Sequence, residues 1–173
     1  DSPPVFASLL DAAAGGSFRI GAPDGRAGTQ RYLPNTNVLE TRFEDGDGAF
    51  RVLDFMPRFV QHGRTFRPTK IVRIVEPLRG TPRINVTCDT VLGWTRGAPR
   101  REAGSHHLAW HGFSAHLRLT TDAALSYLDA GPFALTERKH FVLSWDAPVE
   151  EPLEPLCQRF LEQTQSYWIQ WVK

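Results

Sequence analysis

Four carboxylates on predicted strands are the first residues in this sequence whose type could support catalysis. They are Asp54, Glu76, Asp89 and Glu137. A glycosidase needs two carboxyl groups, about 5–5.5 Å apart for retention or about 6.5–9.5 Å apart for inversion. No spacing in the sequence pairs any two of the four. Asp54 stands out because it interrupts an apolar strand, and we expect it to bond a backbone N–H or an arginine such as Arg58 or Arg73.

Histidines offer a second kind of chemistry, the binding of a metal ion. His107 and His111 share one face of a predicted strand but lie about 13 Å apart, which is too far to bind one ion. His111 and His116 could meet across a hairpin, but no third ligand is positioned beside them. The segment Asp45-Gly46-Asp47-Gly48 resembles the opening of a calcium loop, yet its later ligands are missing. The sequence therefore predicts no metal site.

The sequence also contains no motif for a catalytic nucleophile or a phosphate-binding loop. The sequence has no glycine-rich phosphate loop and no Gly-x-Ser-x-Gly elbow. Cys88 alternates with Ile84 and Val86 on a predicted strand, and Cys157 lies on the apolar face of a predicted helix. Two such cysteines are interpreted as small buried hydrophobic residues in a reducing compartment, with no disulfide framework.

Aromatic side chains are the remaining candidates, because tryptophan rings stack on sugars. The chain has five tryptophans, of which Trp94 and Trp110 are the binding candidates. Core packing explains both at least as well. An exposed row of these two rings beside a groove would favour sugar binding, whereas burial of both would remove it.

Length and charge narrow the class of protein that must position these residues. The chain has 173 residues, 41% of them hydrophobic, which is enough for one domain with a real core. Its net charge of +1 gives no electrostatic reason to propose a nucleic acid or an anionic membrane as partner. No apolar stretch approaches the roughly 20 residues of a membrane span. No basic and apolar leader follows Asp1, so we expect a cytoplasmic protein.

Alternation with a period of two dominates the pattern and predicts an all-β fold, an antiparallel β-sandwich. Strands are predicted over residues 38–43, 49–56, 70–75, 83–92, 107–110, 116–120, 124–128, 133–136 and 138–145. Residues 44–48 carry two Asp-Gly pairs and predict a hairpin turn. Residues 78–82 predict a turn, and residues 95–105 an exposed loop.

Helical spacing is found at both ends of the chain. Residues 4–14 predict one or two helical turns, with Phe6, Leu9 and Leu10 on one face. Residues 153–172 follow the i, i+3, i+4, i+7 rule and predict an amphipathic C-terminal helix. Its last turns carry Tyr167, Trp168 and Trp171, a stripe that needs a partner surface. The pattern leaves two partners open, the sandwich itself and an absent domain.

Two segments carry a resemblance to a known family. Residues 31–41 (RYLPNTNVLET), continued by residues 52–57 (VLDFMP), and residues 71–80 (IVRIVEPLRG) resemble the N-terminal β-sandwich domain of the family-15 glycoside hydrolases. This family includes bacterial glucoamylases, glucodextranases and trehalases. Residues 1–11, 141–145 and 164–171 resemble further parts of that domain in the same order, while residues 95–135 match weakly.

The resemblance implies a fold of the supersandwich type found in galactose mutarotase. It implies that residues 1–150 form the sandwich domain, with leading strands missing, and that residues 151–173 form a linker helix towards an absent helical-barrel catalytic domain. The loss of leading strands would leave an unpaired sheet edge. The family's two catalytic glutamates lie in the barrel, so no catalytic residue is carried over to this chain.

The resemblance also implies a function. We expect a non-catalytic N-terminal domain of an enzyme that hydrolyses α-glucosidic bonds of maltodextrin-type glucans or trehalose with inversion. One glutamate would activate water and another would protonate the leaving oxygen, with no metal or organic cofactor. Tyr167, Trp168 and Trp171 would pack against the barrel of the same polypeptide. The alternatives are a stand-alone carbohydrate-binding sandwich and an assembly domain whose helix pairs with itself.

Overall fold

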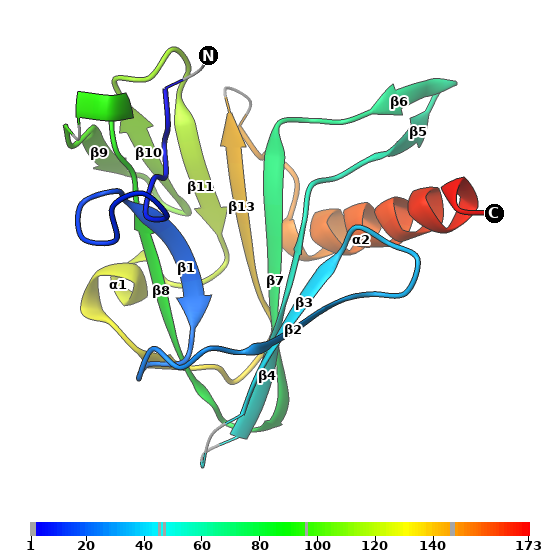
Figure 1. Cartoon of the computed structure of the whole chain (residues 1–173), viewed down its shortest axis with the longest axis horizontal. Helices are drawn as coiled ribbons and strands as arrows, with labels where there is room; N and C mark the ends of the chain where they lie inside the picture. The colour runs from blue at the N-terminus through cyan, green and yellow to red at the C-terminus, as the bar shows by residue number, and fades with distance from the viewer. Residues whose placement is uncertain (1–2, 45, 47, 96, 146–147) are drawn as a thin grey trace.

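The computed structural model describes residues 3–44, 46, 48–95, 97–145 and 148–173. Antiparallel strands are the main secondary structure, as predicted, and an eight-stranded sheet dominates (Figure 1). In spatial order its strands are β2 (Thr29–Tyr32), β3 (Leu39–Glu44), β4 (Gly48–Phe55), β7 (Lys70–Gly80), β13 (Lys139–Trp145), β11 (Leu117–Thr121), β10 (His107–His111) and β9 (Arg100–Ala103).

A smaller sheet of three strands covers part of one face of the large sheet. Its strands, in spatial order, are β1 (Ser17–Gly21), β8 (Arg83–Asp89) and β12 (Phe133–Ala134). The inward side chains of both sheets form the first core. Its centre consists of side chains that are almost fully buried, among them Phe50, Val75, Ile84, Val86, Leu117, Leu119 and Phe141. Burial of this apolar surface is the main stabilising term of the sandwich.

The opposite face of the large sheet is covered by helix α2 (Leu153–Trp171) (Figure 1). The helix buries Leu156, Cys157, Phe160 and Leu161 against side chains of β4, β7 and β13. A hairpin of β5 (Phe59–Gln61) and β6 (Arg64–Phe66) packs against the same helix, where the rings of Phe59 and Phe66 contact the ring of Phe160. The molecule is therefore layered as small sheet, large sheet and helix. No helix in the described ranges is long and apolar enough to cross a membrane.

Several predicted elements are confirmed. The hairpin around residues 44–48 joins β3 to β4, although Asp45 and Asp47 lie outside the described residues. The hairpin between His107 and Thr120 is formed by β10 and β11. The C-terminal helix begins at Leu153, directly after Pro152. Both sandwich and helix follow from period-two and 3.6-residue patterns that agree with the local propensities.

The strand predicted over residues 124–128 is wrong, because this segment forms helix α1 (Leu125–Ala130). Leu125 and Leu128 both pack against the first core. A spacing of three residues places them on one face of a helix, whereas a strand would direct them to opposite faces. Tyr127 then stacks on Phe133 with ring centroids 4.6 Å apart.

Three other predicted boundaries are corrected. The turn predicted over residues 78–82 shrinks to residues 81–82, because β7 continues to Gly80 in register with β4 through a bulge. The loop predicted over residues 95–105 contains β9, a strand paired with β10 at the sheet edge. Residues 4–14 form hydrogen-bonded turns rather than a helix, with Leu9 and Leu10 exposed.

Strands β1, β2, β5 and β6 were not predicted, and a short 3₁₀ turn occupies Gly93–Thr95.

A chain of ion pairs crosses the large sheet on the face that α2 covers. Glu40 contacts Arg31 at 2.7 Å and Arg51 at 3.0 Å, and Arg51 contacts Glu76 at 2.6 Å. Arg138 closes the chain at 2.6 Å from Glu76. Glu40 is nevertheless only 4% exposed. The positive charges of Arg31 and Arg51 offset the free-energy cost of burying this carboxylate.

Burial and hydrogen bonding act in opposite directions on Glu40. Desolvation tends to raise the pKa of this carboxyl, but hydrogen bonds from Arg51 and Arg31 and their charges lower it below its ordinary value of 4.5. The ionised form of Glu40 is therefore more favourable in the folded state than in the unfolded chain. Its stabilisation is complete above pH 4.5 and is lost as the pH falls through the lowered pKa.

Glu40→Gln is expected to lower the free energy of unfolding at pH 7 by about 2 kcal/mol, because the buried side chain loses the charge that pairs with Arg31 and Arg51. The difference from the unmodified chain should narrow below pH 4.5, as the native carboxyl is protonated. Urea denaturation at pH 7 and at lower pH measures both effects. Glu44→Gln, which breaks an exposed pair with Arg42, is the control and should cost less than about 0.5 kcal/mol.

Candidate functional site

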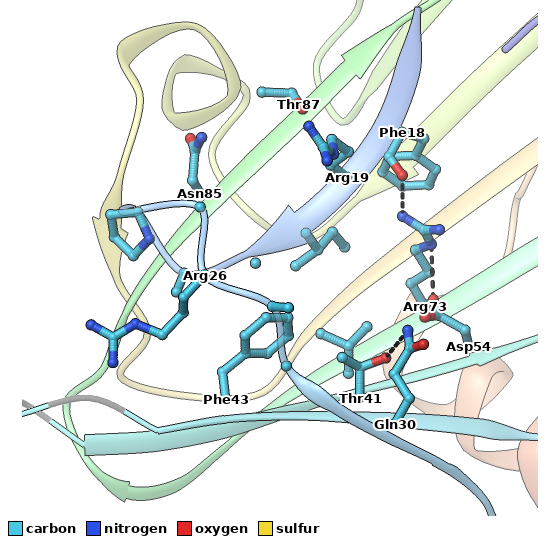
Figure 2. A pocket seen from close by; sticks show the side chains of 18 residues that line it. Phe18, Arg19, Arg26, Gln30, Thr41, Phe43, Asp54, Arg73, Asn85 and Thr87 are labelled. Carbon is cyan, nitrogen blue, oxygen red and sulfur yellow. Dashed lines mark hydrogen bonds and ion pairs between the residues drawn. The ribbon is translucent and has the colours of Figure 1, made fainter. Parts of the chain in front are cut away.

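A polar groove lies beside β1, between the small sheet and the β2–β3–β4 end of the large sheet (Figure 2). Its volume is about 550 Å³, within the range of small-molecule sites. We call it the β1 groove and define it by its polar lining residues, Arg19, Gln30, Thr41, Asp54, Arg73 and Asn85. Phe18 and Phe43 contribute apolar walls.

The segment between β1 and β2 forms one side of the groove and passes close to β3. A Cβ atom at Gly28 would stand 2.7 Å from the Thr41 side chain and 2.8 Å from the Arg42 carbonyl. At such distances any larger residue would force the backbone to move. Glycine at position 28 therefore allows the segment to pass this close to β3. Arg26 in the same segment is held by Asp24 at 2.5 Å and by the Glu44 carbonyl at 2.9 Å.

Arg73 and Asp54 occupy the floor of the groove and connect the two sheets. Arg73 Nε lies 2.8 Å from Asp54 Oδ1, and Arg73 Nη1 donates a hydrogen bond of 2.6 Å to the Phe18 carbonyl. The guanidinium carbon stacks 4.1 Å from the centroid of the Phe18 ring. Desolvation raises the pKa of Asp54 even though the charge of Arg73 opposes the shift. The expectation that Asp54 pairs with an arginine is confirmed, with Arg73 as the partner.

The groove offers no pair of catalytic carboxylates. Among the described residues that line it, Asp54 is the one acidic side chain, and Arg73 engages it. Glu76 is held between Arg51 and Arg138 on the other face of the sheet. Asp89 borders a different cavity of about 520 Å³ together with Asp129, which pairs with Arg101. The described residues of the groove can therefore hold polar groups by hydrogen bonding, but they do not supply the two carboxyl groups that a glycosidase needs.

The tryptophans proposed for sugar stacking do not form a row. Trp94 is 70% exposed in the 3₁₀ turn, whereas Trp110 on β10 is 3% exposed and belongs to the first core. Trp110 borders the cavity that contains Asp89 and Asp129. One ring is thus presented to solvent and the other is packed, so a role of Trp94 and Trp110 in binding stays a prediction.

Histidines and cysteines adopt arrangements without reactive character. His111 and His116 meet across the hairpin, as expected, with ring centroids 5.0 Å apart. No group of three metal-ligating side chains occurs among the described residues. Cys157 is buried near Asp122, which bonds the ring of buried His140 at 2.6 Å. Burial, reinforced by the Asp122 charge, raises the pKa of Cys157 to about 12, so its thiol is not a nucleophile at neutral pH.

The last turns of α2 present the predicted aromatic stripe. Trp171 is 70% exposed, and Ile169 and Val172 are exposed beside it. Tyr167 and Trp168 are partly covered by Arg58, whose guanidinium carbon lies 5.4 Å and 5.7 Å from their ring centroids. Arg58 Nε also donates to the Tyr167 hydroxyl at 3.2 Å. The sandwich therefore covers the first part of the stripe and leaves the Trp171 end open.

The β1 groove was not identified from the sequence, because β1 and β2 were not predicted. The alternation of Phe18 and Ile20 with Arg19 was the available signal, but it spans only four residues between Gly16 and Gly21. Gln30 and Asn85 carry no local signal of their own. They come together only through the pairing of distant strands.

Residues 1–119, more than half of the chain, match the family described as "Trehalase-like, N-terminal". The chain belongs to this family. Segments 31–57 and 71–80, which carry the family-15 resemblance, both fall inside the matched range. They form much of β2, β3, β4 and β7, which build one half of the large sheet.

Three curated relatives that the chain matches are trehalases. The chain is 26% identical over 180 residues to a trehalase of Thermoplasma acidophilum, covering 99% of this chain and 31% of that protein. It is 29% identical over 203 residues to a trehalase of Mycobacterium tuberculosis and 27% identical over 201 residues to one of Mycolicibacterium smegmatis. Coverage of this chain is again 99%, but only 29% and 30% of those proteins. The chain thus spans about 30% of the length of these relatives. No solved structure matches it.

Arg73→Met is expected to lower the free energy of unfolding by about 2–4 kcal/mol, because it removes the link to Phe18 and leaves the half-buried Asp54 carboxylate without its charge partner. Adding Asp54→Asn to the same chain should recover part of the loss, since no unpaired charge then remains. Urea denaturation of the single and double variants measures this coupling. Purely additive losses would contradict the assigned role of the pair.

Proposed function

We propose that this chain serves as the non-catalytic N-terminal domain of a longer glycosidase of the family-15 type. The parent polypeptide would hydrolyse the α-glucosidic bonds of trehalose or of maltodextrin-type glucans with inversion. Membership of the trehalase-like N-terminal family supports this proposal, as do trehalase relatives about three times longer than the chain.

The exposed aromatic end of α2 is the observation that carries the proposal. Residues 1–150 would form the domain proper, and residues 151–173 would lead into the rest of the polypeptide. Trp171, Ile169 and Val172 form an apolar surface that neither the large sheet nor the β5–β6 hairpin covers. Its occupant in this proposal is the catalytic part of the same polypeptide, against which Tyr167, Trp168 and Trp171 pack. An interface centred on tryptophans is energetically favourable, because large aromatic side chains dominate such contacts.

Arg58 has a defined part in this arrangement. Its backbone N–H bonds Thr164 Oγ1 at 3.2 Å, and its side chain rests against Tyr167 and Trp168. These contacts fix the direction of the last helical turns relative to the sandwich. A helix held at a fixed angle presents its exposed end to a docked domain with little loss of conformational entropy.

The 173-residue chain alone is expected to release no glucose from trehalose or maltotetraose, because the acid and base of the reaction lie outside it in this proposal. An NMR time course of the anomeric protons measures turnover directly. Release of β-glucose by the isolated chain would contradict the non-catalytic role. Broadening of the sugar signals without turnover, abolished by Trp94→Ala, would instead favour the stand-alone carbohydrate-binding alternative.

Trp171→Ala is expected to change the stability of the 173-residue chain by less than about 0.5 kcal/mol, because the ring is exposed there. In the longer polypeptide the same change should cost about 2 kcal/mol or more, since the ring is then buried at the junction. Urea denaturation of both forms provides the comparison. Leu9→Ala changes a fully exposed apolar residue far from α2 in the sequence, and as the control it should be neutral in both forms. Equal effects of Trp171→Ala in the two forms would exclude the junction.

A further inference from the structure

A second cavity, of about 520 Å³, lies between the end of β8, the β9–β10 edge of the large sheet and α1 (Figure 1). Its volume suits a small molecule. Among the described residues, Thr87 is the one that lines both this cavity and the β1 groove. We call it the β8 cavity and define it by six of its lining residues, Cys88, Asp89, Arg101, Trp110, Leu128 and Asp129.

The backbone of β8 supplies polar groups to this cavity. Phe18 lies opposite Cys88 in the ladder between β1 and β8, and the Phe18 carbonyl points away from β8 towards Arg73. Phe18 and Cys88 are therefore a non-hydrogen-bonded pair, so the N–H and carbonyl of Cys88 point away from β1, towards α1. On that same side of the strand, the Pro82 carbonyl accepts a hydrogen bond from Leu135. Cys88 thus brings one backbone donor and one acceptor to the cavity.

Arg101 and Asp129 form a polar rim on the other side of the cavity. Arg101 lies opposite Trp110 in the ladder between β9 and β10, so both side chains project from the sheet face that lines the cavity. Arg101 Nη1 lies 2.8 Å from Asp129 Oδ1, and this ion pair connects β9 to α1. The two side chains keep 39% and 62% of their surface exposed. They present guanidinium donors directly beside a carboxylate acceptor.

The apolar part of the cavity wall is fixed by the first core. Trp110 and Leu108 are 3% and 2% exposed and belong to that core, and Leu128 packs against it. Trp110 therefore contributes a rigid wall and not a freely exposed stacking face. A wall of this kind suits the C–H surface of a compact ring, while the polar rim selects the groups attached to the ring.

The charges around the cavity favour a neutral ligand. Among the described lining residues, the charged groups are Asp89, Asp129 and Arg101. Burial raises the pKa of the Cys88 thiol to about 12, so this group is neutral at neutral pH. Two carboxylates against one guanidinium repel an anion, and Arg101 beside Asp129 removes the advantage of a cation. A ligand rich in hydroxyl groups meets both the donors and the acceptors without bringing a charge.

We propose that the β8 cavity binds a neutral sugar, one pyranose ring of an α-glucoside. Two neighbouring hydroxyl groups of the ring bond the Arg101–Asp129 pair, a further hydroxyl bonds the Cys88 backbone, and the C–H surface of the ring lies against Trp110 and Leu128. The choice of an α-glucoside rests on the proposed function. The choice of a neutral polyhydroxyl ring rests on the lining of the cavity alone.

NMR titration of the isotope-labelled 173-residue chain with trehalose and with maltotetraose tests the proposal. The Cys88 amide and the Trp110 indole signal should shift in a saturable manner with at least one of the two sugars. The side-chain amide of Gln30 in the β1 groove and the indole signal of exposed Trp94 should stay in place. An absence of saturable shifts with both sugars would overturn the proposal. Shifts centred on Trp94 or on the β1 groove would also overturn it, because the sugar would then occupy another site.

Two neighbouring arginines on β9 provide matched variants. Arg101 faces the cavity beside Trp110, whereas Arg100 lies opposite His111 on the other face of the sheet. Arg101→Gln should weaken sugar binding at least about tenfold, because charged donors to the sugar hydroxyls are lost. Arg100→Gln should leave the affinity unchanged, and equal affinities of the two variants would contradict the assigned site. If Arg101→Gln fails to fold in urea denaturation, Asp129→Asn tests the same rim and should also weaken binding.

Turnover of the same sugars by the longer polypeptide separates this proposal from the proposed function. Saturable shifts in the 173-residue chain, without turnover by the longer polypeptide, would exclude only the glycosidase. Turnover by the longer polypeptide, without shifts at the β8 cavity, would exclude only the sugar site.

Discussion

Burying both faces of one eight-stranded sheet is the constraint on which the rest of this structure depends. One face is covered by a sheet of only three strands and the other by a single helix with a short hairpin. Neither cover is as wide as the sheet. The β1 groove lies where the small sheet ends, and the ion-pair chain from Arg31 to Arg138 lies on the face shared with α2. Both are polar because they occupy margins of the covered area.

The sequence predicted those parts of the fold whose pattern is long and local. The 19 residues of α2 repeat their apolar spacing over five turns, and β4 and β13 combine buried residues with clear turn signals. Short elements were less predictable. In α1, the spacing of Leu125 and Leu128 is the single feature of the sequence that favours a helix over a strand. In β1, only two positions are apolar. With so few apolar positions and no hairpin turn beside them, the helical and the strand pattern are hard to distinguish in these two segments.

The features of the candidate site also differ in how far the sequence could predict them. The arginine partner of Asp54 was expected from its place in an apolar strand, because a buried carboxylate requires compensation. The aromatic end of α2 was visible because its residues are close in sequence. The β1 groove and the buried position of Glu40 depend instead on strands that are distant in the chain. Their pairing is set by the whole sheet, and no local motif encodes it.

The position of β13 in the large sheet has a consequence for how the chain is made. This strand lies between β7 and β11, yet it is the last strand in sequence. Until residue 145 has been synthesised, the growing chain holds two separate half-sheets, each with an open inner edge. The 65 residues between the end of β7 and the end of β13 take roughly 3–13 s to translate. The half-sheet of β2, β3, β4 and β7 keeps its inner edge unpaired throughout that interval, whereas the half-sheet of β9, β10 and β11 is complete only once residue 121 has been made. Such open edges can pair with strands of other chains.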